Sequence, residues 1–156
     1  MRNVLFLCAV VAVVAVVAGV ASATATAAPI GSTLSGTITS GGGWCCGSYG
    51  TVEGTANVVG VGRVSFDAYR ETGHDPYQVP MTGFTTERVV LTAMNGDTLT
   101  LAGAGDTQDS GGLVVPWSVV GGTGRFSSTS GSGTFSFNLD WGTSSGTIVL
   151  TGTLFR

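Results

Sequence analysis

Hydrophobic and polar residues alternate in short runs along most of the chain. In the run 133–140, for example, Phe135, Phe137 and Leu139 fall on one face and polar residues fall on the other. This period of two is the pattern of a β-strand with one buried face. Similar runs recur at about ten-residue spacing, over 33–39, 50–59, 62–69, 87–93, 97–104, 113–120, 133–140 and 146–155. Such spacing predicts an all-β protein, either a sandwich or a barrel.

Turn-forming residues punctuate these runs. Asn95-Gly96 stands between two alternating runs and predicts a tight hairpin, because both residues tolerate positive φ. Pro116 lies inside the run 113–120, where it predicts an edge, a bulge or a bend. Glycines inside strands often mark a bulge or a barrel corner. Four predicted strands contain one, namely Gly36, Gly54, Gly103 and Gly152.

The first 28 residues have the features of an export signal. Arg2 provides a positive start, residues 4–20 are apolar or small, and Ala25-Thr26-Ala27 fits the small-x-small cleavage pattern. We therefore expect a cleaved signal peptide over 1–28 and a β-barrel domain over 29–156, located outside the cell or at its surface. An uncleaved anchor is the alternative, because the apolar run is near the lower length limit of a spanning helix.

Composition supports a single β-rich domain and excludes some partners. The chain has 156 residues, of which 26 are glycine and only 10% are charged. Without the leader, five arginines face nine carboxylates, a net charge of −4, and no basic stripe is present. Binding to nucleic acid or attraction to anionic membranes depends on clustered basic residues. We expect neither, and no stable membrane insertion after cleavage.

A glycine-rich turn gives the sequence a family resemblance. The segment "GGTGRF" (121–126) follows a predicted strand, and further glycines open the next strand. It resembles the turn signature of dirigent proteins and allene oxide cyclases, and the segments 95–105 and 146–155 are also similar to that superfamily. The resemblance covers about 60 residues well, from 95 to 155. It implies an antiparallel barrel of eight strands around an apolar cavity, often in an oligomer.

The residues of this turn indicate an architectural role. Three glycines within residues 121–124 permit backbone angles closed to other residues, and Phe126 can then close the barrel interior. The predicted structural motif consists of Gly121, Gly122, Thr123, Gly124 and Phe126. The resemblance also implies that enzymes of the family place carboxylates, an arginine and a tyrosine inside the barrel. No motif places such a set here, so we predict no catalytic residue and no cofactor.

Charged residues on the predicted strands decide how a cavity would be lined. Asp67, Arg70, Glu87 and Arg88 lie at strand ends or at alternating positions. Charged side chains are mostly exposed, so we expect all four to face outward. Any that face inward would line a cavity in the way that the family's enzymes require.

The longest polar loop holds the only histidine. Glu71, His74, Asp75 and Tyr77 form an acidic segment that could chelate a metal or transfer a proton. Zinc sites need three or four ligands from His, Cys or carboxylate. We therefore interpret the segment as a solvated loop and predict no metal site.

Cys45 and Cys46 are adjacent in the sequence, which leaves three states open. Neighbouring Cα atoms are about 3.8 Å apart across a trans peptide bond, whereas disulfides span about 4.4–6.8 Å, so a vicinal bridge would be strained. The flanking glycines tolerate such strain. Bonds across a dimer or two reduced, packed thiols are the alternatives.

Three functions are compatible with these patterns. The first is a secreted, non-catalytic barrel that binds an apolar small molecule or acts at the cell surface. The second is a dirigent-like or cyclase-like enzyme that guides an intramolecular bond-forming step. The third is a structural or adhesive envelope protein that forms homo-oligomers.

Overall fold

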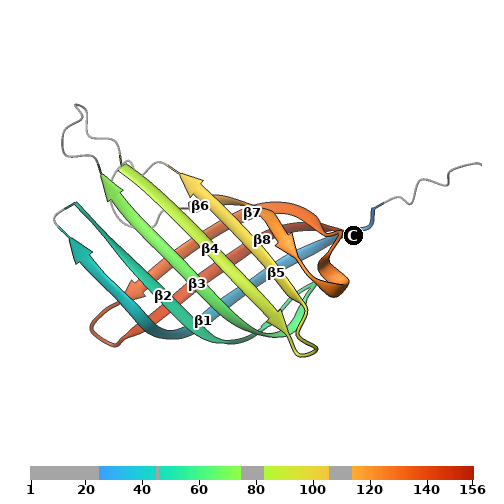
Figure 1. The fold of residues 1–156 in the computed structure, drawn as a ribbon, viewed down its shortest axis with the longest axis horizontal. Coiled ribbons are helices and arrows are strands. Elements are labelled where there is room, and N and C mark those ends of the chain that lie inside the picture. The colour runs from blue at the N-terminus through green and yellow to red at the C-terminus, as the bar shows by residue number, and fades with distance from the viewer. Residues whose placement is uncertain (1–24, 45, 75–82, 106–113) are drawn as a thin grey trace, which may run out of the picture.

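The protein is a closed, antiparallel β-barrel of eight strands (Figure 1). The computed structural model describes residues 25–44, 46–74, 83–105 and 114–156. The strands are β1 (Ala27–Trp44), β2 (Gly47–Val58), β3 (Gly62–His74), β4 (Gly83–Ala93), β5 (Thr98–Gly105), β6 (Val114–Gly122), β7 (Ser130–Asp140) and β8 (Ser145–Phe155). A short 3₁₀ helix, η1 (Gly124–Phe126), precedes β7. In the described part of the chain, no helix has the length and apolar character needed to cross a membrane.

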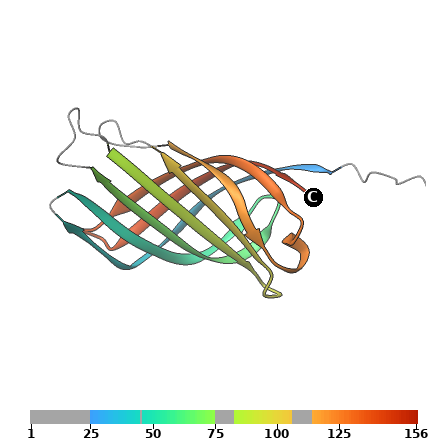
Figure 2. The same cartoon turned by 45° about the horizontal axis from the view of Figure 1, so that its top comes forward.

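Each strand pairs with its neighbours in sequence, and β8 pairs with β1 to close the barrel. The barrel therefore has two distinct ends. The terminal end holds the start of β1, the end of β8, η1 and the β2–β3 and β4–β5 turns (Figures 1 and 2). The distal end is where β1, β3, β5 and β7 finish. The start of β1 and the end of β8 thus lie together at one end of the barrel.

The predicted strands match the observed ones in number and order, and the all-β barrel is confirmed. The largest difference is β1, which begins at Ala27 rather than at residue 33. Residues 27–32 do not alternate in polarity, but Ala27 pairs with Phe155 and Pro29 pairs with Thr153. Pairing with β8 therefore extends β1 beyond the alternating run of the sequence that predicted it. Most of the predicted leader lies outside the described residues.

Pro116 occupies neither an edge nor a free strand, because a closed barrel has no edge. Pairing between β5 and β6 ends at Gly103 opposite Trp117, so Pro116 lies immediately beyond that ladder. The register also shifts between Thr100 and Leu101 in the same pair of strands. The missing N–H of proline is accommodated where the β5–β6 pairing ends, while β6 still pairs with β7 at Pro116.

The middle and the terminal end of the barrel interior are filled with apolar side chains. The inward-facing residues of every strand contribute, and η1 adds Phe126, which is fully buried. The largest fully buried side chains in this core include Leu34, Leu91, Leu99, Leu101, Phe126, Phe135, Ile148, Leu150 and Leu154. Among the described residues, the buried charged group is Glu87, which lies toward the distal end.

Two paired glycines make room for the largest of the core side chains. Gly133 on β7 lies opposite Gly152 on β8, and the Trp117 ring lies over both. A Cβ atom at Gly152 would be 2.5 Å from Cζ2 of Trp117. The indole N–H donates to the carbonyl of Thr151 at 3.2 Å, so the ring is also fixed by a hydrogen bond. The packing of the Trp117 ring therefore requires that Gly133 and Gly152 carry no side chain.

We predict that Gly152→Ala destabilises the barrel by about 1–3 kcal/mol, because a methyl group there overlaps the Trp117 ring and neighbouring backbone. Urea denaturation followed by tryptophan fluorescence measures the effect. Gly31→Ala is the matched control, since its Cβ atom would meet only the Leu150 carbonyl at 3.7 Å. Equal stability of the two variants would contradict this packing.

Candidate functional site

An arginine and a glutamate face the barrel interior toward the distal end. Arg70 on β3 lies directly opposite Glu87 on β4, and Nε of Arg70 is 3.6 Å from Oε1 of Glu87. The Glu87 side chain is fully buried, and that of Arg70 is 17% exposed. The guanidinium also donates through Nη1 to the carbonyl of Phe137 on β7 at 3.0 Å. Arg70 therefore reaches across the interior from β3 to β7.

Several buried polar atoms at this position lack hydrogen-bond partners among the described residues. They are Nε of Arg70, Oγ1 of Thr85 and both carboxylate oxygens of Glu87. The distance between Arg70 and Glu87 is that of an ion pair but is too long for a hydrogen bond. A buried polar group without a partner costs about 1–3 kcal/mol. A cluster of such atoms is typical of a site that receives water or a ligand.

The environment of Glu87 favours its protonated form. Burial raises the pKa of this carboxyl to about 7, and the Arg70 guanidinium opposes that rise without cancelling it. The proton therefore exchanges near neutral pH, which is the range in which a carboxyl group can act as an acid or a base. Such a shift inside a barrel marks the residue as a functional candidate.

We predict that Glu87 makes the barrel less stable as pH rises from about 4.5 to about 7. In that range the carboxyl of the unfolded chain has lost its proton while the folded one keeps it, so deprotonation favours unfolding. Thermal melts of the wild type and Glu87→Gln at pH 5 and pH 8 test this. The Tm difference between the two proteins should change in favour of the variant at pH 8, and a difference independent of pH would contradict it.

Glycines and one tryptophan shape the distal interior around this pair. Gly41 on β1 and Gly50 on β2 are paired, and the Trp141 ring lies against both from the turn between β7 and β8. A Cβ atom at Gly50 would be 3.1 Å from both Cη2 of Trp141 and Cδ1 of Leu139. Trp141 remains 46% exposed. It forms a partial apolar cover over the distal end.

The expectation that all four strand charges face outward is wrong for Arg70 and Glu87. Asp67 and Arg88 do lie on the outer wall, where each lines a surface hollow. The alternation of inward and outward residues along each strand indicates this inward orientation, because Arg70 is two residues after the buried Ala68. Glu87 is likewise two residues before the buried Val89. The general preference of charges for the surface obscured this alternation.

The glycine-rich turn 121–126 lies at the terminal end, on the β4–β5 hairpin. Thr98 N–H donates to Oγ1 of Thr123 at 2.8 Å, and Thr123 N–H donates to the carbonyl of Thr98. Asp97 accepts from the Arg125 N–H at 3.1 Å. Gly124 has φ +52° and no space for a side chain beside Asp97. These contacts hold Phe126 in the core. The guanidinium groups of Arg125 and Arg156 both lie over its ring.

We predict that Asp97→Asn lowers the Tm at neutral pH and that its effect shrinks in acid. Hydrogen bonds from the Arg125 backbone and the Asn95 side chain lower the pKa of Asp97, so the folded state favours the charged form. This stabilisation is present above the ordinary aspartate pKa and is lost as pH falls through the lowered value. Thermal melts at pH 7 and pH 3 measure it. An effect of equal size at both pH values would exclude the carboxylate charge as its cause.

The predicted polar loop falls largely outside the described residues. Glu71 lies on the outer wall and accepts a hydrogen bond from the Tyr69 hydroxyl at 2.9 Å. His74 is the last residue of β3, its side chain is outside the described part, and so are Asp75 and Tyr77. Within the described ranges, no three His, Cys, Asp or Glu residues are grouped to hold a metal ion. The interpretation of this segment as a solvated loop therefore stays a prediction.

Cys46 belongs to the turn between β1 and β2, at the distal end. Cys46 is partly buried there, and Cys45 lies outside the described residues. The vicinal bridge therefore stays a prediction. Cys46 lies at the same end of the barrel as Arg70, Glu87 and Trp141.

Comparison of the chain with protein-family models, with curated proteins and with solved structures finds no match. The eight-stranded antiparallel barrel agrees with the fold that the dirigent and allene oxide cyclase resemblance implies. Membership of that superfamily remains an interpretation of the glycine-rich turn.

Proposed function

We propose that the protein is a secreted, non-catalytic barrel that binds an apolar small molecule at its distal end. The observation that carries the proposal is the cluster of buried polar atoms of Arg70, Thr85 and Glu87 that have no hydrogen-bond partner among the described residues. The middle of the interior and its terminal end are packed with apolar side chains, which leaves this cluster as the polar part of the distal interior. The leader predicted over 1–28 supports export.

The walls of the distal end suit a molecule that is apolar over most of its surface. Phe137 and Val115 are buried, and Leu139 and Trp141 border the glycines of β1 and β2. Ligand sites commonly combine such apolar walls with a few polar groups that fix orientation. Arg70 and Glu87 would supply that orientation here, because each has a polar atom that no described residue satisfies.

An uncharged fluorescent dye tests this proposal. Gly105 is the last residue of β5 and lies opposite Thr85, and the nearest atom to its Cβ position is 3.8 Å away on Val115. A phenylalanine at this position therefore projects into the distal interior. We expect Nile red to bind the purified protein at one site and Gly105→Phe to weaken that binding about tenfold or more, as measured by fluorescence titration.

Ala104→Phe is the control, because Ala104 is adjacent on the same strand and exposed on the outer wall. It should leave the dye affinity unchanged. The proposal fails if the wild type does not bind the dye, or if both variants reduce binding equally while remaining folded by circular dichroism.

A second candidate function is acid–base chemistry at the same site, in a cyclase-like or isomerase-like reaction. The observation that favours it is the Glu87 carboxyl, whose pKa of about 7 lets it hold or release a proton near neutral pH. Glu87→Gln separates the two functions. A binding barrel keeps its ligand in this variant, whereas an enzyme keeps the ligand and loses turnover.

A further inference from the structure

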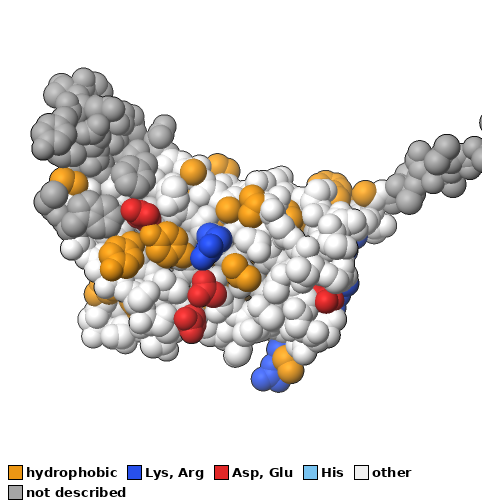
Figure 3. Space-filling view, viewed as in Figure 1, with side chains coloured by type: hydrophobic (Ala, Val, Ile, Leu, Met, Phe, Trp, Pro, Cys, Tyr) orange, Lys and Arg blue, Asp and Glu red, His pale blue; other side chains and the backbone are white. Residues whose placement is uncertain are grey.

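The outer wall of the barrel is uneven in its chemistry. On β1 and β5–β8 the outward residues are mainly serine, threonine, valine and small residues. Charged and aromatic side chains instead gather on the wall over β2–β4, as Figure 3 shows. We call this surface the tyrosine–acid face and define it by Tyr49, Glu53, Asp67, Tyr69, Glu71 and Arg88.

Strand pairing places these side chains in three neighbouring rows. Tyr49 lies opposite Glu71. In the next row, Tyr69 lies opposite Arg88, and Glu53 lies opposite Asp67 in the third. Paired residues of adjacent antiparallel strands have Cβ atoms about 4.5–5.5 Å apart. The rows therefore form one continuous surface rather than separate points.

Two hollows lie on this face. One, of about 430 Å³, is bordered by Tyr69, Thr86 and Arg88 and has Ala102 and Gly103 along its other side. The small residues of β5 leave space beside the tyrosine. Tyr49, in the row beyond, exposes 40% of its surface. Aromatic surface is thus available next to a charged donor.

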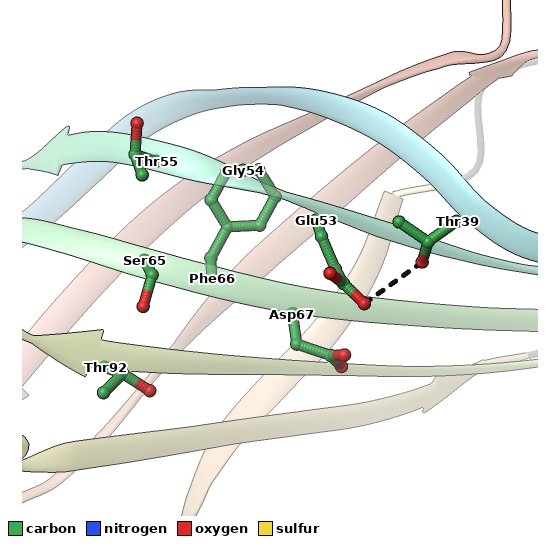
Figure 4. Close-up of a pocket in the computed structure, with 8 residues that line it drawn as sticks. All are labelled: Thr39, Glu53, Gly54, Thr55, Ser65, Phe66, Asp67 and Thr92. Atoms are coloured by element: carbon green, nitrogen blue, oxygen red, sulfur yellow. Dashed lines mark hydrogen bonds between the residues drawn. The ribbon is translucent and has the colours of Figure 1, made fainter.

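The second hollow, of about 630 Å³, is lined by carboxylates and hydroxyls (Figure 4). Glu53 and Asp67 extend toward the same space, and the Thr39 hydroxyl donates to Oε1 of Glu53 at 3.1 Å. The other hydroxyls of the lining belong to Thr55, Ser65 and Thr92. Phe66 and Gly54 complete the lining, which therefore combines hydrogen-bond acceptors with apolar surface.

The carboxylate pair is unfavourable without a partner. Like charges on directly opposed residues destabilise a sheet. Among the residues that the structure describes, the ion pair formed is that of Arg70 with Glu87, on the inner side of the wall, and none involves Glu53 or Asp67. The two carboxylates therefore keep acceptor capacity that a ligand rich in hydrogen-bond donors would use.

We propose that the tyrosine–acid face binds an uncharged polysaccharide. Each hydroxyl of a sugar can donate to a carboxylate, which only accepts, and can accept from Arg88, which only donates. Tyrosine rings supply rigid apolar surface for the carbon-bound hydrogens of a sugar ring while their hydroxyls stay polar. Three carboxylates against one arginine would repel an anionic glycan.

The closed barrel makes a bound peptide the weaker interpretation. An extended peptide commonly binds by adding a strand to an exposed sheet edge. This barrel has no edge, because β8 pairs with β1. A partner on the wall must therefore bind through side chains alone, which a chain of hydroxyl-bearing rings can do along its whole length.

Polysaccharide depletion tests the proposal on the full-length secreted protein. The probes are insoluble cellulose, chitin and starch, each incubated with the protein in low salt and in 1 M NaCl. We expect retention on at least one of them in both salts, because hydrogen bonding and apolar packing carry the interaction. Tyr49→Ala and Asp67→Asn should each weaken retention by about tenfold.

Val149→Ala is the matched control, since Val149 lies on the outer wall of β8. Its exposed fraction of 42% is close to the 40% of Tyr49. It should bind as the wild type does. Three results would overturn the proposal: no retention on any of the polysaccharides, equal retention of all variants, or retention that is lost in 1 M NaCl. Glu87 borders the smaller hollow, but its side chain is buried inside the barrel, whereas Tyr49 and Asp67 lie on the outer wall. Loss of polysaccharide retention in these variants is therefore distinguishable from loss of Nile red binding.

Discussion

Closure of the barrel by the pairing of β1 with β8 is the constraint on which the other features depend. Eleven consecutive residue pairs join the two strands, from Ala27 with Phe155 to Thr37 with Ser145. Because the sheet has no edge, every strand divides its residues between one interior and one exterior. Alternation in the sequence then becomes a separation between a buried core and an outer wall, and the charged residues within the described strands β2, β3 and β4 face one or the other.

That separation explains how a chain with few charges can hold two chemically different surfaces. Arg70 and Glu87 lie on the inner face of β3 and β4, while Tyr69 and Arg88 are their immediate neighbours on the outer face. Adjacent positions of the same two strands therefore serve opposite sides of the wall. The glycines also determine the packing of the interior, because they leave the space that large rings such as Trp117 and Trp141 occupy.

Most of the fold could be predicted from the sequence, because strand parity and turn residues are local signals. The eight runs, the Asn95-Gly96 hairpin and the buried Phe126 all follow from such signals. The start of β1 could not be predicted, since residues 27–32 become a strand only through β8. The inward Arg70–Glu87 pair was missed because its stability depends on a partner on the neighbouring strand, and a general preference for exposure outweighed the parity signal.

The first and last strands of the barrel are adjacent, and this adjacency has a topological consequence. The backbones of Thr26 and Arg156 exchange hydrogen bonds in both directions, so the first and last strands meet as closely as any hairpin. A short linker could join these positions, and the chain could then be opened at the Asn95-Gly96 turn without breaking a ladder. The order in which the strands are synthesised is thus separable from the architecture that they form, and a circularly permuted gene should encode the same barrel.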